Sequence, residues 1–142
     1  PSLKSCTRDT FEPNTVLTSQ DVFEITHQMA DILLHLHQQG VSHGDIYAHN
    51  TMYDSHNNVL FGDFGAATNL NELSVEQRTK MQLIEVRAFG CFMDDLLSLV
   101  EKKDTLFEVL TKISQGALVE ELTLRTDFIY LLNELNKLKS SS

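Results

Sequence analysis

The stretch SHGDIYAHNTMYDSHNNVLFGDFGAAT, residues 42–68, gathers acids, amides, histidines and glycines in a chain that otherwise has the pattern of amphipathic helices. Two short runs, residues 50–54 and 57–63, flank the turn-rich SHNN and predict a small hairpin. Asp45 lies five residues before Asn50, and Asp63 lies thirteen residues after it. The hairpin would fold the chain back, so these three oxygen-bearing side chains should converge at one end of it.

Such a set of side chains suits a particular chemistry. Carboxylate and amide oxygens are the ligands that Mg²⁺ takes, usually together with waters and substrate phosphates. One amide and one carboxylate on the metal, with a free carboxylate nearby as base, would suit phosphoryl transfer. Asp45 and Asn50 could instead be loop caps, because Asp and Asn favour turns.

Helices are predicted on both sides of this stretch. Thr18 and Asp21 fit a capping box, and a helix of about 20 residues should follow and end at Gly40. Its apolar stripe is formed by Val22, Ile25, Met29, Ile32 and Leu36. Residues 81–100 are apolar on nearly every side and predict a buried helix. Further helices are expected at residues 106–114, 119–124 and 128–137.

Composition narrows the class of protein. The 142 residues fit one domain, and the net charge of −9 with no basic run argues against nucleic-acid binding. No apolar run reaches about 18 residues, so no membrane span is expected. Two cysteines far apart in sequence favour a reducing, cytoplasmic setting. The chain starts at Pro1 without a methionine, which suggests a fragment.

The spacing of these motifs resembles the protein-kinase-like family. HGDIYAHN resembles the catalytic loop and GDFG the DFG segment, and the two are separated as in typical kinases. IEVRAFGCFMDDLL is similar to the central buried helix of the kinase C-terminal lobe, with Glu85 where the family usually has Asp and Gly90 five residues later. LRTDFIYLLNEL is similar to the closing helix, with Arg125 at the position of a structural arginine. The finer likeness is to kinases associated with leucine-rich repeats.

The resemblance implies a role for each matched residue. Asp45 would accept the proton of the substrate hydroxyl, Asn50 and Asp63 would hold Mg²⁺, and Met52 would lie beneath the base of ATP. The structural residues would be His43, Phe64 and Gly65 in the two motifs, with Glu85 anchoring the catalytic loop from below and Arg125 near the chain end. The implied fold is a mainly α, C-lobe-like helical bundle whose small β-hairpin carries the catalytic and DFG segments.

Residues 1–17 have weak periodicity and are expected to be a lead-in segment, residues 18–139 form the C-lobe-like domain that the resemblance implies, and residues 140–142 are expected to be a disordered tail. No glycine-rich loop, V-A-I-K strand or A-P-E motif is present. The kinase N-lobe is therefore an expected missing partner, and this chain alone should be inactive, with a Kd for ATP of roughly 1 mM or weaker. The other implied partner is a hydroxyl substrate, either a protein or a small molecule.

Departures from the kinase pattern keep two other functions open. Gly44 replaces an arginine, Tyr47 replaces a phosphate-contacting lysine, and the segment between Asp63 and Glu85 is short. These changes favour a pseudokinase that serves as a binding or scaffold module, although Asp45, Asn50 and Asp63 are intact. The His-Gly-Asp sequence is also common in small-molecule phosphotransferases. A zinc site from His35, His37 and His43 is disfavoured, since no cysteine joins them.

Overall fold

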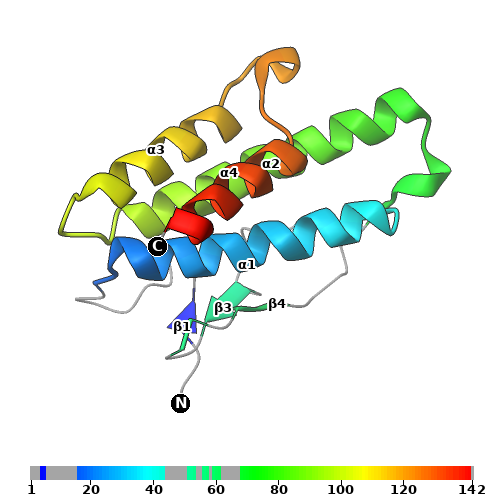
Figure 1. Ribbon diagram of the computed structural model, residues 1–142. Coiled ribbons are helices and arrows are strands. Elements are labelled where there is room, and N and C mark those ends of the chain that lie inside the picture. The colour runs from blue at the N-terminus through cyan, green and yellow to red at the C-terminus, as the bar shows by residue number, and fades with distance from the viewer. Residues whose placement is uncertain are drawn as a thin grey trace.

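Four helices form the body of the molecule. The computed structural model describes residues 4–5, 16–43, 51–53, 56–57, 59–61 and 68–141, and every structural statement below concerns these residues. The helices are α1 (Ser19–Gln38), α2 (Val75–Leu97), α3 (Thr105–Ala117) and α4 (Phe128–Ser141). Helices α1 and α2 run antiparallel, and α1 lies between the strands on one side and the other helices on the other (Figure 1). The predicted mainly α fold is confirmed.

Helix α1 begins and ends where its local sequence predicts. The Thr18 side chain accepts the N–H of Asp21, and the Asp21 carboxylate accepts the N–H of Thr18, so the capping box is complete. Gly40 has φ +81° just past the last turn, a conformation in which glycine is favoured. Val22, Ile25 and Met29 are buried as predicted, but the buried face continues through Leu33 and His37. Ile32 and Leu36 are half-buried.

Helix α2 is longer than predicted. It starts at Val75 rather than near Met81, because Ser74 caps it and Gln77 completes a second capping box. The first two turns carry mainly polar, exposed residues, so they show no apolar stripe in the sequence. The second half is the buried helix that was expected, and it enters the common core of all four helices. That core includes Phe89, Phe92, Met93, Leu96, Leu110, Leu131 and Leu135.

The later helices differ in extent from the prediction. Helix α3 is longer at both ends than the predicted 106–114. A helix was predicted at residues 119–124, but the structure has the short 3₁₀ helix η4 (Leu122–Leu124) there instead. Helix α4 begins at residue 128 as predicted and extends past the predicted end at residue 137, to Ser141.

The strands are short and form two separate sheets, of which the three-stranded sheet lies below α1 (Figure 1). The predicted hairpin is present as β3 (Thr51–Tyr53) and β4 (Val59–Phe61). A third strand, β1 (Lys4–Ser5), pairs antiparallel with β3, and β2 (Val41–Ser42) pairs with β5 (Thr68–Asn69). The sequence predicted the hairpin but not β1, β2 or β5. Strands of two residues are too short to show alternation, so the sequence held no signal for them.

Candidate active site

The predicted site residues divide into two groups. Five of them lie outside the described residues: Asp45, Asn50, Asp63, Phe64 and Gly65. Met52 lies in the middle of β3, paired with Leu60 of β4. His43, Glu85 and Arg125 are described together with their contacts. The roles predicted for all of these residues remain predictions. The structure describes segments next to the two motifs in sequence and the contacts that those segments make.

The hairpin provides the first part of that framework. Thr51, which follows Asn50 in sequence, is paired with Phe61, two residues before Asp63. The turn of the hairpin is fastened to α1 through Asn57, whose φ of 60° is tolerated by asparagine. The Asn57 amide donates to Asp21 Oδ1 at 2.8 Å and to Glu24 Oε1 at 2.9 Å. The Val59 N–H donates to Gln28 Oε1 at 3.1 Å, so the hairpin is held along one face of α1.

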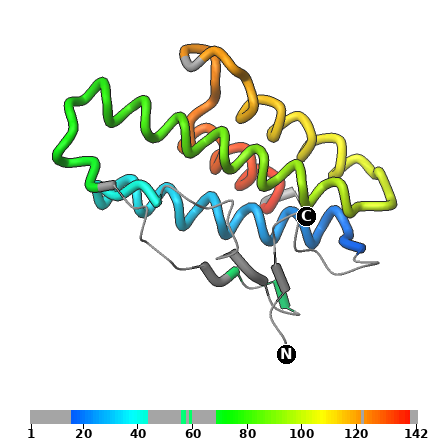
Figure 2. The backbone as a smooth tube through the Cα atoms, turned by 180° about the vertical axis from the view of Figure 1, so that it is seen from behind, coloured from blue at the N-terminus to red at the C-terminus, as the bar shows by residue number. Residues whose placement is uncertain are grey.

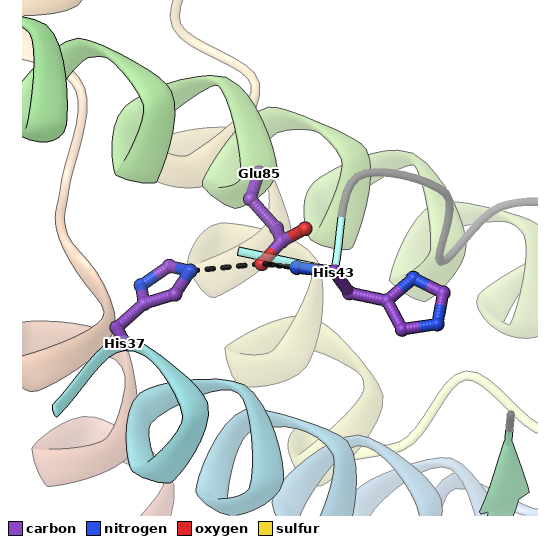
Figure 3. A network of polar contacts seen from close by, with 3 residues as sticks. All are labelled: His37, His43 and Glu85. Atoms are coloured by element: carbon purple, nitrogen blue, oxygen red, sulfur yellow. Dashed lines mark hydrogen bonds and ion pairs between the residues drawn. The ribbon is translucent and has the colours of Figure 1, made fainter. Parts of the chain in front are cut away.

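The second part is a buried carboxylate. Glu85 of α2 is 3% exposed, and its Oε1 accepts the backbone N–H of His43 at 3.2 Å (Figure 3). The same oxygen lies 2.8 Å from Nε2 of His37 at the end of α1. An ionised Glu85 would accept this hydrogen bond from the His37 tautomer that carries its proton on Nε2. One carboxylate thus joins α1, α2 and the residue after β2, directly before Gly44 of the candidate catalytic loop.

His37 is the residue of this network that the sequence analysis missed. It is 8% exposed, and its ring packs edge-on against Phe128 of α4 at 5.1 Å between centroids. Phe128 in turn packs against Phe89 of α2 at 5.5 Å. The sequence holds a signal that could have found it, because His37 continues the four-residue steps of Met29 and Leu33. The predicted stripe followed Ile32 and Leu36 instead.

Arg125 holds a turn of the backbone together. Its guanidinium donates to three carbonyl oxygens: Val119 at 2.7 Å, Leu83 at 2.9 Å and Glu120 at 3.1 Å. Leu83 belongs to α2, so the arginine joins the segment before α4 to the middle of the central helix. The sequence by itself indicates no partner for Arg125. Here the partners are backbone oxygens, and the planar five-donor guanidinium fits such a fork.

The described residues contain no group of three or more His, Cys, Asp or Glu side chains placed to hold a metal ion. No helix among them is long and apolar enough to cross a bilayer. Asp21 and Asp104 both lie at helix starts, and the pKa of each carboxyl group is below its ordinary value. Burial raises the pKa of Asp21, but hydrogen bonds from Thr18 and Asn57 more than offset this, and the pKa lies below its ordinary value.

The chain is similar to one known protein family and to several known proteins. The protein kinase domain family matches residues 3–84, more than half of the chain. The serine/threonine-protein kinase grp of Drosophila melanogaster is 35% identical over 60 residues, which are 42% of this chain and 12% of that protein. The eIF-2-alpha kinase GCN2 of Mus musculus is 32% identical over 65 residues, 46% of this chain and 4% of the relative. The human GCN2 is 29% identical over 75 residues, 53% of the chain and 4% of the relative.

The chain belongs to the protein kinase family. The matched residues include both motifs, His43 to Asn50 and Asp63 to Gly65, and end directly before Glu85. The aligned stretch covers 12% or less of the length of each relative named above. The association with leucine-rich repeats stays a prediction.

Proposed function

We propose that this chain is the C-terminal lobe of a protein kinase that transfers the γ-phosphate of ATP to a serine, threonine or tyrosine hydroxyl with Mg²⁺. The observation that carries the proposal is the hydrogen bond from the His43 N–H to Glu85, because it fastens the start of the candidate catalytic loop to the buried helix α2. The names of the relatives, which are protein kinases, support a protein substrate over a small molecule.

The proposed roles follow the motif residue by residue. Asp45 holds the proton of the attacking hydroxyl, as the base of the kinase family does. Asn50 and Asp63 offer the amide and carboxylate oxygens that suit Mg²⁺, which neutralises phosphate charge when bound. The pairing of Thr51 with Phe61 supports this assignment, since it closes the hairpin close in sequence to both ligands. Met52 of β3 is assigned to the base of ATP.

A direct test compares radiolabel transfer from ATP by the full-length protein and by its Asp45→Asn variant. Loss of general-base catalysis should lower the rate by about 100-fold or more. Asp94→Asn is the matched control, because this aspartate is exposed on α2 and belongs to neither motif. Equal transfer by the wild type and Asp45→Asn would contradict the proposed role of Asp45.

We expect the 142-residue chain by itself to bind Mg-ATP weakly. Without a glycine-rich loop and its lysine, the remaining contacts should give a Kd of roughly 1 mM or weaker. Isothermal titration calorimetry of this chain with Mg-ATP measures that affinity. Micromolar binding would show that the phosphate grip does not require an N-lobe.

The scaffold function remains the second candidate. The short segment between Asp63 and Glu85, with Gly44 and Tyr47, supports it. A full-length protein that binds a partner but transfers no label, with or without Asp45→Asn, would favour it. We also propose a cytoplasmic location, on the cysteine content alone.

A further inference from the structure

An open groove of about 960 Å³ lies on the helical body. It is bordered by the end of α1, the first half of α2, and the segment from η4 into the start of α4. The first half of α2 extends beyond the start of α4, which leaves this part of the α1–α2 pair without a covering helix (Figures 1 and 2). The groove is separate from the hairpin, on the other side of α1.

The lining of the groove is apolar in its centre and at one edge. Its apolar members are Leu34, Leu83, Val86, Phe128 and Ile129. Val86 and Phe128 belong to the buried core and form its floor, whereas Ile129 is 59% exposed. Leu124, beside the groove residues Thr123 and Arg125, is 72% exposed. Large apolar side chains that gather on an exposed concave surface are typical of a binding surface.

The lining of the groove carries a net negative charge, because its carboxylates, Glu76, Glu121 and Asp127, outnumber its cations, Lys80 and Arg125. Lys80 pairs with Glu76 at 3.2 Å, and the three guanidinium nitrogens of Arg125 donate to backbone carbonyls. The carboxylates of Glu121 and Asp127 accept hydrogen bonds from neutral groups, the Thr123 hydroxyl and the Tyr130 N–H. Two carboxylates therefore face an occupant without a paired cation among the described residues.

We propose that this groove binds an amphipathic helical segment of a partner protein, with apolar side chains at helical spacing and lysine or arginine beside them. The apolar row would fill the space over Val86 and Phe128, and the basic side chains would meet Glu121 and Asp127. The groove is bordered by α1, α2, η4 and α4, and no strand among the described residues lines it, so side chains rather than main-chain pairing must carry recognition, as when a helix binds in a groove.

The test uses the 142-residue chain as bait for a displayed library of random 16-residue peptides. We expect enriched peptides with apolar residues spaced three and four apart and a net positive charge. Ile129→Asp should weaken a selected peptide by about tenfold or more, because it removes buried apolar area. Ile84→Asp is the matched control, since Ile84 is 55% exposed on α2 but does not line the groove. It should leave the affinity within about twofold.

A second pair of variants tests the charge. Glu121→Lys should weaken binding by about threefold or more, and the effect should shrink in high salt. Glu101→Lys makes the same change in an exposed loop outside the groove and should have little effect. Circular dichroism melting confirms that each variant is folded.

Several outcomes overturn the proposal. These are no enrichment, enrichment of acidic peptides, or equal loss of binding in Ile129→Asp and Ile84→Asp. Self-association of the chain that Ile129→Asp abolishes would assign the groove to a second copy instead.

Discussion

At the scale of single residues, Glu85 connects helix α2 to the end of α1 and to the backbone of His43. Its carboxylate is almost fully buried, and one of its oxygens serves both the His43 N–H and the His37 ring. A buried carboxylate is costly unless hydrogen bonds satisfy it. The partners of Glu85 come from residues 42 and 48 positions away in sequence, so this side chain holds distant parts of the chain together.

Glu85→Ala should lower the free energy of unfolding by about 3 kcal/mol, because it removes the buried hydrogen bonds that Glu85 Oε1 makes with the His43 N–H and the His37 ring. Glu85→Gln keeps an acceptor oxygen and should cost only about 1 kcal/mol. Urea unfolding followed by circular dichroism measures both values. If Glu85→Gln is as damaging as Glu85→Ala, the negative charge rather than the hydrogen bonding is the important property.

At the scale of elements, helix starts carry much of the local order. Asp104 is the N-cap of α3: its Oδ1 accepts the Phe107 N–H at 2.9 Å. Its Oδ2 accepts the hydroxyl of Ser19, in the first turn of α1, also at 2.9 Å. These hydrogen bonds, first from Phe107 and then from Ser19, hold the pKa of Asp104 below its ordinary value. One carboxylate therefore caps one helix and fastens it to another.

The low pKa of Asp104 predicts a loss of stability in acid. The folded-state pKa is lower than the unfolded one, so the unfolded chain binds more protons in the acid range. The stabilisation is present above about pH 4 and is lost as the pH falls through the folded-state pKa. Asp104→Asn still caps α3 but does not titrate, so its urea midpoint should change less between about pH 5 and pH 3.

A second variant separates the two donors to Asp104. Ser19→Ala removes one donor and leaves the carboxylate, so it should flatten the acid dependence of the urea midpoint only in part. A profile for Asp104→Asn that matches the wild type would show that this carboxylate does not contribute to the acid dependence.

At the scale of the whole molecule, the close approach of α2 and α3 depends on Gly90. A Cβ at this position would lie 2.9 Å from Cβ of Ala117 and 3.0 Å from Cγ of Leu118. The sequence singled out Gly90 as part of a family pattern without giving its physical reason. The reason is that the two helices pack with no room for a methyl group between them.

Gly90→Ala should therefore destabilise the molecule by roughly 1–2 kcal/mol, although alanine favours a helix more than glycine does. Ala117→Gly in the same chain should restore part of the loss, with a coupling energy of about 0.5 kcal/mol or more. Thermal unfolding of the two single variants and the double variant measures this coupling. If the changes in stability of the two single variants simply add in the double variant, the two positions are not coupled. The helices would then move apart at this point without a cost in free energy.

The sequence by itself determined the features that depend on neighbouring residues. The capping box of Thr18 and Asp21, the stop at Gly40 and the hairpin between β3 and β4 each arise within a few residues, so local pattern was enough. The spacing of the two motifs likewise identified the family, because that spacing is a property of the chain. Where the local pattern was weak, as in the polar first turns of α2, the boundary was wrong.

Tertiary structure alone decided the contacts between distant residues. The pairing of β2 with β5, the meeting of His37 and Glu85, the carbonyl partners of Arg125 and the groove all join segments far apart in sequence. Hydrophobic periodicity indicates that a helix face is buried but not which face it meets. That choice follows from packing the helices into one core, which brings His37 to Glu85 and leaves the start of α2 uncovered.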